Sequence, residues 1–286
     1  MQRIYEHEHG QRSDEFSPVL KPRPAYGRAA LTYGLIRFAL TSARQGYWDF
    51  LGNAIQSLGE LAVLTGADAI RPDGVVACNL CGWSGRRFYP NTGAGYYERD
   101  SICPGCMASD RYRSLYEIMR RCTPVFTAGN RIVEVAPLRS LEAIFRSYPE
   151  LDYVSFDIER HAMERGDITN MRHDDDSVDW FICFHVLEHI PDEAAALGEI
   201  HRILRPGGSA LLQVPVDWSA SATREYGAPD PRDVGHVRCY GRDFAKRIAA
   251  GGFDVEKIDP VGRLDPALIS QEGLSPEPIF IARAIK

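Results

Sequence analysis

The sequence predicts an α/β domain built on a parallel sheet, preceded by a small four-cysteine zinc domain and an N-terminal helical segment. Residues 177–215 have the pattern of strand, helix and strand with short links, and the helix ends at Arg205-Pro206-Gly207-Gly208. This pattern predicts a βαβ unit with a right-handed crossover. Two C-x-x-C pairs lie within residues 76–110. Apolar residues recur at helical spacing over residues 28–65.

Length and composition suit a globular protein of more than one unit, with 286 residues, of which 44% are apolar and 25% charged. We expect an arm and helical segment at 1–75, a zinc knuckle at 76–110 and the sheet domain at 111–286. Residues 131–286 carry 18 basic and 27 acidic groups, a net charge of −9. Because proteins bind nucleic-acid backbones through Lys and Arg, this acidity argues against a nucleic-acid partner.

The first residues do not resemble a targeting segment, since residues 1–10 are polar and lack the apolar core of a secretory signal. The most apolar early run, residues 29–40, is interrupted by Arg37 and is too short to span a bilayer. Seven cysteines, four of them at metal-ligand spacing, are compatible with a reducing compartment. We therefore expect a cytoplasmic protein with no membrane span.

The N-terminal helical segment carries two apolar stripes. They consist of Leu31, Leu35, Phe38 and Ala39, and of Phe50, Ala54, Ile55, Leu58, Leu61 and Ala62. We expect both stripes to pack against the body of the protein. A homodimer contact, a substrate lid and a membrane-surface helix are the functional alternatives, the last disfavoured because the segment is not rich in Lys or Arg.

The four clustered cysteines predict a structural zinc site. Cys78 and Cys81 form one C-x-x-C knuckle, Cys103 and Cys106 form another, and 21 residues separate them. Each knuckle brings two thiolates to one ion, and four thiolates close a tetrahedron. No coordination position then remains for water or substrate, so we expect structural Zn²⁺. A pair of disulfides is the alternative, which a cytosolic compartment disfavours.

The turn after the apolar run Val178–Phe184 contains His185-x-x-Glu188-His189, which also fits the H-x-x-E-H pattern of some zinc proteases. That chemistry needs the motif inside a helix, so that both histidines face one metal. Here the motif follows a buried strand directly and leads into Pro191, which favours a turn. We therefore set the protease interpretation aside.

The stretch DWFICFHVLEHIPDE…EIHRILRPGGSALLQVP resembles the region after the cofactor site in class I S-adenosylmethionine (SAM)-dependent methyltransferases. The segments CNLCGWSGRRF and CPGCMASDRYRSLYEIM resemble the zinc knuckle found ahead of some bacterial members. This resemblance implies a Rossmann-like seven-stranded methyltransferase sheet with helices on both faces. It also implies SAM as the cofactor.

The resemblance places the methionine part of SAM at the first turn of the sheet domain, near Glu134, Ala136 and Pro137. The family pattern there is an acidic residue followed by glycines. The acid is present and the glycines are absent, although Ala136 is small enough for a close approach. Pro137 lacks an N–H donor, and Ser140 could cap the helix that follows.

Further along, the resemblance implies that Asp157 binds the ribose hydroxyls, with Glu159 as the fallback, and that Asp167 lies near the adenine amino group. The predicted cofactor site also includes Ile158 and Ile168.

His185 follows the strand Val178–Phe184, at the end of an α/β sheet where ligands bind. It is therefore both a cofactor-pocket residue and a candidate catalytic residue. We expect His189 to orient the turn instead.

Residues 215–240 form a long polar insertion after the fifth strand, which should overhang the active site. Its segment HVRCYGRDF resembles one in the same methyltransferase group. His236 is the expected general base, because an imidazole titrates near neutral pH, and Asp217 is a further candidate. The expected substrate contacts are Trp218, Tyr226, Arg238 and Tyr240. As the alternative, His236 and Arg238 only anchor the insertion.

We therefore expect SAM-dependent methyl transfer to a hydroxyl or amine of a small molecule or glycan. One alternative is an RNA methyltransferase that uses the zinc knuckle, because residues 78–121 carry 7 basic and 4 acidic groups, a net +3. Another is a non-catalytic methyltransferase-like binding module, which the glycine-free first turn motivates.

Overall fold

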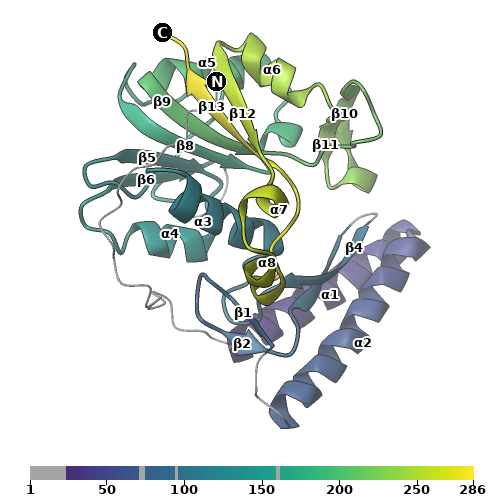
Figure 1. Ribbon diagram of the computed structural model, residues 1–286. Helices are drawn as coiled ribbons and strands as arrows, with labels where there is room; N and C mark the ends of the chain where they lie inside the picture. Colours follow the sequence, from purple (N-terminus) through teal and green to yellow (C-terminus); the bar gives the residue numbers. More distant parts are fainter. Residues whose placement is uncertain (1–23, 71–74, 94–95, 159–161) are drawn as a thin grey trace.

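The protein is described here by a computed structural model that covers residues 24–70, 75–93, 96–158 and 162–286 (Figure 1). Glu159, the fallback ribose ligand, lies outside the described residues. The main sheet has seven strands in the order β12-β13-β9-β8-β5-β6-β7. Their bounds are β5 Arg131–Val135, β6 Asp152–Asp157, β7 Glu164–Arg165, β8 Val178–Phe184, β9 Leu204–Gln213, β12 Phe253–Ile258 and β13 Ile279–Ala284.

Six of these strands run in the same direction, and β13 runs opposite to them, pairing antiparallel with both β9 and β12. The chain starts in the middle of the sheet at β5, adds β6 and β7 on one side, and then returns to add β8 and β9 on the other. This order confirms the predicted Rossmann-like methyltransferase sheet.

Alternate side chains of the central strands feed two separate cores. Ile132 and Ile182 face α3 and α4, whereas Val133 and Cys183 face α5 and α6. The helices span α3 Asp110–Cys122, α4 Arg139–Phe145, α5 Glu193–Ile203 and α6 Phe244–Ala250. Figure 1 shows α3 and α4 on one face of the sheet and α5 and α6 on the other. The predicted cover on both faces is therefore confirmed.

The junction of α5 and β9 differs from the prediction. Asp192 caps α5 by accepting a hydrogen bond from the Ala195 N–H at 2.9 Å, and the helix ends at Ile203. The sequence predicts that Arg205–Gly208 separate helix from strand, but β9 begins at Leu204 and includes these residues. The pairing register with β8 shifts here, and Gly207 takes a φ of 78°, so the break residues form an irregularity within the strand.

The four-cysteine unit contains two small antiparallel pairs, formed by β1 Val76–Ala77 with β2 Ser84–Gly85 and by β3 Tyr89–Gly93 with β4 Tyr96–Ile102. Its core continues into the sheet domain, because Leu80 and Phe88 belong to the same buried cluster as Leu115 and Ile132. The expected boundary between residues 110 and 111 is thus not a break in packing.

Arg113 on α3 ties the four-cysteine unit to the C-terminal part of the chain. Its guanidinium is fully buried, lies 3.6 Å from the centre of the Phe88 ring, and donates to the carbonyls of Ser101 and Glu272 at 2.8 and 2.7 Å. Burial lowers the pKa of this group. Arg113 therefore joins the two parts of the chain through hydrogen bonds to backbone carbonyls.

The N-terminal helices α1 Pro24–Gln45 and α2 Trp48–Ile70 lie against each other, and α2 packs on the β3–β4 pair. The buried contact consists of Leu35, Leu61, Leu64, Tyr89 and Ile102. Part of the expected stripes stays outside it, since Ile55 is 60% exposed. Within the described residues, none of the helices combines the length and the apolar character that crossing a membrane requires.

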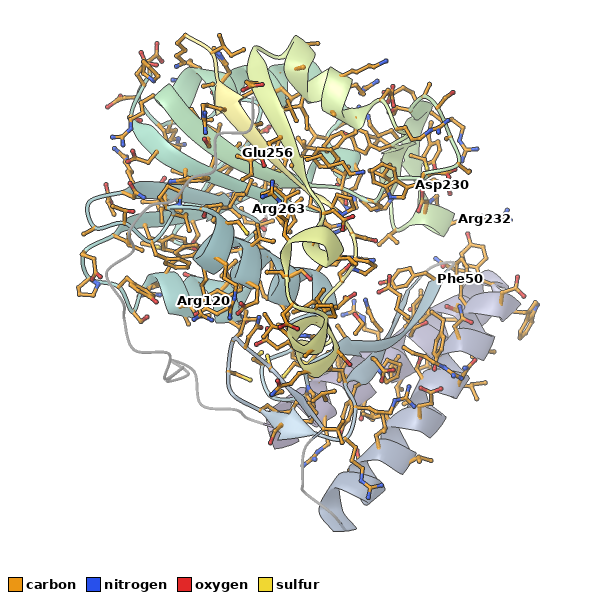
Figure 2. All side chains as sticks on the ribbon, viewed as in Figure 1. Phe50, Arg120, Asp230, Arg232, Glu256 and Arg263 are labelled. Carbon is orange, nitrogen blue, oxygen red and sulfur yellow. The ribbon has the colours of Figure 1, made fainter. Side chains whose placement is uncertain are left out.

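Residues 215–240, expected as a loop, contain an antiparallel hairpin of β10 Arg224–Asp230 and β11 His236–Cys239. We call this segment the lid. Asp230 and Arg232 mark its tip in Figure 2. The figure also labels Glu256 and Arg263, which pair at 2.9 Å where β12 leads into α7 Pro260–Arg263 and α8 Pro266–Glu272. These last two helices have no counterpart among the elements expected from the sequence.

Candidate functional site

The crevice at the carboxyl ends of β5 and β8 is the switch point of the sheet, where the strand order reverses. Val135 pairs with Cys183 at these ends, so the residues that follow them face the same opening. Two of those residues have left-handed backbones, Ala136 at φ 51° and His185 at φ 53°. Such strain on residues other than glycine concentrates at functional sites.

Ala136 lies where the resemblance leads us to expect a glycine in the first turn. Its positive φ is a conformation that glycine adopts without strain and alanine tolerates at a cost of about 1 kcal/mol. The Ala136 N–H donates to the Phe156 carbonyl at 2.9 Å, which holds the turn against β6. The turn therefore keeps a glycine-type path with a small side chain added.

Glu134 supports this turn from inside. Its side chain is 1% exposed and accepts a hydrogen bond from the Tyr153 hydroxyl at 2.6 Å. A backbone hydrogen bond from Leu138 also reaches it. Burial raises the pKa of Glu134 to about 8. The carboxyl therefore shapes the turn in this conformation, and its effect on a cofactor would be transmitted through the backbone.

The start of α4 differs from the expected cap. The N-cap residue is Leu138, which has no side-chain oxygen, and Ser140 lies inside the helix. The Ser140 hydroxyl is buried without a hydrogen-bond partner among the described residues. Leu138 packs on the core beneath the sheet, and Pro137 is half-buried. Ser140 therefore does not cap this helix.

The predicted adenosine residues gather at the ends of β6 and β7. Asp157 ends β6 at 6% exposure, whereas Ile158 beside it is exposed and Ile168 is buried. Asp167 is exposed, and one of its oxygens accepts from the Thr169 N–H at 2.9 Å and from the Thr169 hydroxyl at 2.8 Å. Asp167 would have to give up part of this turn to bind an adenine amino group.

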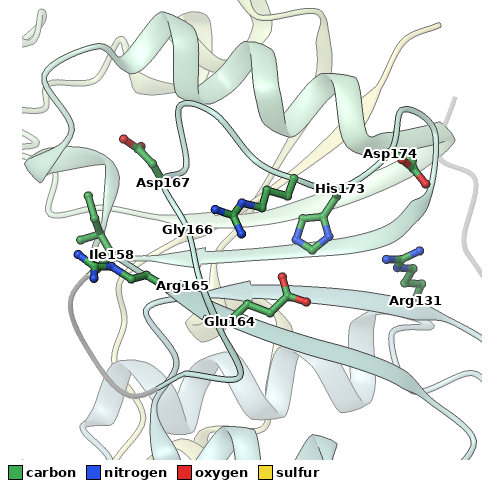
Figure 3. Close-up of a pocket in the computed structure, with 9 residues that line it drawn as sticks. Arg131, Ile158, Glu164, Arg165, Gly166, Asp167, His173 and Asp174 are labelled. Atoms are coloured by element: carbon green, nitrogen blue, oxygen red, sulfur yellow. The ribbon is translucent and has the colours of Figure 1, made fainter.

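A hollow of about 700 Å³ runs along this edge of the sheet (Figure 3). Ile158 and Asp167 lie at one end of it, with Arg131 and Asp174 at the other. The lining is strongly charged, because the remaining residues are Glu164, Arg165, Gly166, Arg172 and His173. The hollow therefore borders the expected adenosine position and extends well beyond it.

His185 is held by three contacts at the end of β8. Its backbone N–H donates to the Gln213 carbonyl at 3.0 Å, its Nε2 lies 3.3 Å from Gln213 Oε1, and its Nδ1 lies 3.3 Å from Glu188 Oε1. The imidazole is 19% exposed. It is thus fixed at the crevice while part of the ring stays accessible.

A second imidazole pair lies where the lid meets the turn after β8. The rings of His189 and His236 are 4.7 Å apart, and His236 Nδ1 lies 3.2 Å from Asp233 Oδ1. Burial lowers the pKa of His189, which favours its neutral form at neutral pH. His189 therefore contacts the lid as well as lying in the turn, which goes beyond the orienting role expected for it.

The remaining lid residues divide by exposure. Asp217 is exposed and accepts from the Ser219 N–H at 2.9 Å and from the Ser219 hydroxyl, which lowers its pKa and makes it a turn-forming residue. Trp218 is 41% exposed, with Lys257 Nζ 4.1 Å from its ring centre. The Tyr226 hydroxyl donates to Asp233 at 2.8 Å. Of these groups, Trp218 is the one whose ring is open to solvent.

Arg238 and Tyr240, expected at the substrate, are instead buried at 3% and 0% exposure. The Tyr240 hydroxyl donates to Glu193 on α5 at 2.7 Å. The Arg238 guanidinium donates to the carbonyls of Leu187 and Ile190 at 2.8 and 2.6 Å. Both polar ends are engaged by the protein, so in place of a substrate contact they anchor the lid, which agrees with the alternative for Arg238.

The four predicted zinc ligands converge. The sulfur atoms of Cys78 and Cys106 are 3.7 Å apart, as are those of Cys81 and Cys103. Zn–S bonds of about 2.3 Å in a tetrahedron place sulfurs about 3.8 Å apart, so this spacing fits a zinc ion and is too long for disulfides. Burial raises the pKa of the Cys103 thiol, so a bound cation is needed to hold the group as a thiolate.

Glu188 was noted in the sequence only within the H-x-x-E-H pattern, and three further functional-site neighbours were missed: Tyr153, Gln213 and Asp233. Each acts by contacting a residue that was predicted, as Tyr153 does with Glu134. The available signal was positional for Gln213, a polar residue within the apolar run that ends β9. No comparable signal marks Asp233, which lies among other polar lid residues.

Comparison with known proteins bears on the region between α4 and β9. Residues 142–212 match the family model of a methyltransferase domain. That segment includes Asp157 and His185, and it begins after the turn at Ala136. The match therefore covers the strand end at Asp157, where a ribose is expected, and not the glycine-free turn.

Two curated proteins share limited segments with this chain. An uncharacterised 37.1 kDa protein in transposon Tn4556 of Streptomyces fradiae is 31% identical over 107 residues, which are 35% of this chain and 31% of that protein. A protein of Mycolicibacterium smegmatis named "Probable S-adenosylmethionine-dependent methyltransferase" is 31% identical over 98 residues, 34% of this chain and 37% of that protein. The chain thus spans about a third of the length of either relative.

Among solved structures, a chain in the complex of the Haloferax volcanii Trm112 methyltransferase activator with a methyltransferase is similar. The TM-score is 0.45 at 16% identity, over 62% of this chain and 90% of that chain. The fold assignment rests on the strand order of this protein and not on that score.

Proposed function

We propose that this protein is a SAM-dependent methyltransferase that acts on a hydroxyl or amine of a small molecule or glycan. The observation that supports it most is the strand order, with left-handed Ala136 and His185 at the two strand ends that flank the switch point. Asp157 is suitably placed for a ribose at the end of β6. The methyltransferase-domain match over residues 142–212 supports the same interpretation.

SAM would supply a methyl group on a sulfonium, so methyl transfer needs the acceptor and methyl carbon held in line. Positioning of that kind is worth effective molarities of about 10⁵–10⁸ M. His185 and His236 are the candidate bases for an acceptor that arrives protonated, since both lie where the lid approaches β8. The acidity of residues 131–286, with 27 acidic and 18 basic groups, favours a small acceptor over RNA.

We also propose that Zn²⁺ occupies the four-cysteine cluster in a structural role. All four ligands would come from the protein, which leaves no position for substrate. The cluster belongs to the same core as α3, so the ion would stabilise the platform under one face of the sheet.

Calorimetry with S-adenosylhomocysteine on the full chain tests the cofactor assignment. The Asp157→Ala variant should bind at least tenfold more weakly. Asp152→Ala is the matched control, because Asp152 starts the same strand at its opposite end and is 63% exposed. No binding by the unmodified protein would sink the methyltransferase proposal and leave the non-catalytic binding module. Unchanged affinity in Asp157→Ala would remove Asp157 from the cofactor site.

A further inference from the structure

We infer a second metal site in this protein, for a divalent transition-metal ion, formed by Glu188, His189 and His236. One carboxylate oxygen and one ring nitrogen from each histidine lie within 4.8 Å of one another. A carboxylate with two imidazoles is a ligand set that suits Zn²⁺ and other divalent ions of the first transition row. The site is separate from the four-cysteine cluster, which uses thiolates only.

Glu188 supplies an independent reason to place a cation here. Its side chain is 1% exposed, and neither of its oxygens has a hydrogen-bond partner within the described part of the chain. The ring nitrogen His185 Nδ1 lies 3.3 Å from Oε1 but misses hydrogen-bond geometry. An ionised carboxylate buried in this way is costly unless a positive charge compensates it. A bound metal ion would provide that charge.

Both histidines are already oriented as metal ligands usually are. His236 Nδ1 faces the Asp233 carboxylate at 3.2 Å, and His189 makes a backbone hydrogen bond to Gly235. A ligating histidine typically donates its other ring N–H to a carboxylate or a backbone carbonyl, which fixes the tautomer. Each ring here therefore has a protein contact of the kind that usually fixes a ligating histidine.

The elements that carry the three ligands are locked together. Arg238, two residues after His236, donates to the carbonyls of Leu187 and Ile190 on either side of Glu188 and His189. Val234, just before the β11 ligand, has a left-handed φ of 55°, an outlier for a β-branched residue. This strained approach brings His236 to the turn, and strain of this kind is typical of functional sites.

Two of the three proposed ligands, Glu188 and His189, come from the H-x-x-E-H pattern. Leu187–His189 form a single 3₁₀ turn, so the motif lies outside an α-helix, which confirms the expectation. His185 is held by Gln213, and the lid's His236 takes the place of a second histidine from the motif. With three protein ligands, the ion would keep open positions, as catalytic rather than structural metal sites do.

The open positions suggest the class of acceptor, an inference that rests on the proposed methyltransferase function. An acceptor with a metal-ligating hydroxyl would be bound as the oxyanion, its proton having passed to water. The oxygen's electron pair then forms the O–CH₃ bond while the C–S pair returns to sulfur, giving neutral S-adenosylhomocysteine. In this assignment His236 serves as a ligand, and His185 is the candidate base only for an acceptor that the ion does not bind.

Metal content of the full-length protein tests the site without reference to activity. After treatment with EDTA, equilibrium dialysis against Zn²⁺ should give two zinc ions per chain at saturation. The ion in the four-cysteine cluster should remain bound during the EDTA treatment, and the ion in the second site should be removed by EDTA and bind again. His236→Ala and Glu188→Gln should keep the ion in the four-cysteine cluster and lose the ion in the second site, with at least tenfold weaker binding. Asp233→Asn should weaken it by about tenfold.

His201→Ala is the matched control, because this imidazole lies on α5 away from the cluster and contacts the Ile285 carbonyl. It should keep both ions. Thermal melts show whether each variant is folded. They also report binding, because Zn²⁺ should raise the melting temperature of the EDTA-treated wild type and leave that of Glu188→Gln unchanged. A single ion in the wild type, or a second ion that survives His236→Ala, would overturn the site. If S-adenosylhomocysteine fails to bind while both ions do, the methyltransferase proposal falls and the metal site stands.

Discussion

The Tyr153 hydroxyl donates a hydrogen bond to Glu134 across the neighbouring strands β5 and β6, with 2.6 Å between Oη and Oε2. This contact sits directly beneath the turn that opens the crevice. Burial raises the pKa of Glu134 from its ordinary 4.5 to about 8. Because the folded protein holds the proton more tightly than the unfolded chain does, this residue links folding stability to pH.

The sign of that linkage gives the first prediction. Glu134 contributes its full stability below pH 4.5, and the contribution is lost as pH rises toward 8, since the folded state then retains a proton that the unfolded state releases. The loss is on the order of 3–5 kcal/mol. Glu134→Gln keeps an acceptor for Tyr153 and removes the titration. Urea unfolding at pH 5, 6.5 and 8 should therefore show a flatter pH profile in the variant.

Glu272, whose pKa burial also raises to about 8, supplies the slope that remains. Glu256→Gln is the matched control, because it makes the same substitution at a carboxylate that is 56% exposed and outside the buried contact. A Glu134→Gln profile as steep as that of the wild type would show that the carboxyl is ionised in the fold.

Ala136 gives a second prediction from its positive φ of 51°. Ala136→Gly removes a strained side chain and should raise the free energy of unfolding by up to about 1 kcal/mol, less the entropy that glycine gains in the unfolded chain. Ala210→Gly is the opposite control, since Ala210 is fully buried in the regular part of β9 and its loss should destabilise by at least about 1 kcal/mol. Equal destabilisation by both changes would argue against strain at Ala136.

The central sheet could be predicted because its signals are local. β8 is apolar except for Asp179 and is buried on both faces, and its observed bounds, Val178–Phe184, are those predicted. A glycine pair, Gly251-Gly252, directly precedes β12, Phe253–Ile258, and marks where that strand starts. The four cysteines converge because two short knuckles fix them locally. In each case the pattern carries its own structural reason.

The lid could not be predicted from local patterns. Residues 215–240 contain few of the apolar residues that mark strands, and the hairpin is held by contacts with distant elements. The buried Arg238 guanidinium donates a hydrogen bond to the Leu187 carbonyl. The buried Tyr240 hydroxyl donates a hydrogen bond to Glu193. In the sequence, both residues lie in a polar segment whose composition is typical of an exposed, ligand-binding loop. Burial of a polar residue depends on partners that only the fold brings near.

The four-cysteine cluster supports a third prediction. Cys103→Ser should release the zinc ion and destabilise the protein by several kcal/mol, because the cluster shares one buried core with α3. Metal analysis and thermal unfolding would measure both effects. Cys122→Ser is the control, since this thiol is exposed and outside the cluster, and it should change neither. A zinc-loaded Cys103→Ser protein of normal stability would remove the structural role.

The fourth prediction concerns the lid anchor. Arg238→Ala would leave the carbonyls of Leu187 and Ile190 without their donor, and leaving a buried acceptor unsatisfied costs about 1–3 kcal/mol. Because the guanidinium joins β11 to the turn after β8, the hairpin should loosen before the sheet unfolds. Limited proteolysis should therefore cut within residues 215–240 faster in the variant, while far-ultraviolet circular dichroism stays near that of the wild type.

Arg224→Ala tests whether the effect comes from the anchor or from any lost lid charge. Arg224 lies on the same hairpin, is exposed, and contacts the Tyr226 hydroxyl at 3.4 Å. Its removal should leave both the stability and the cleavage rate near those of the wild type, because contacts of exposed charges contribute little. If the two variants are cut equally fast, the lid is not held through Arg238, and the rigid approach of His236 to His189 loses its main support.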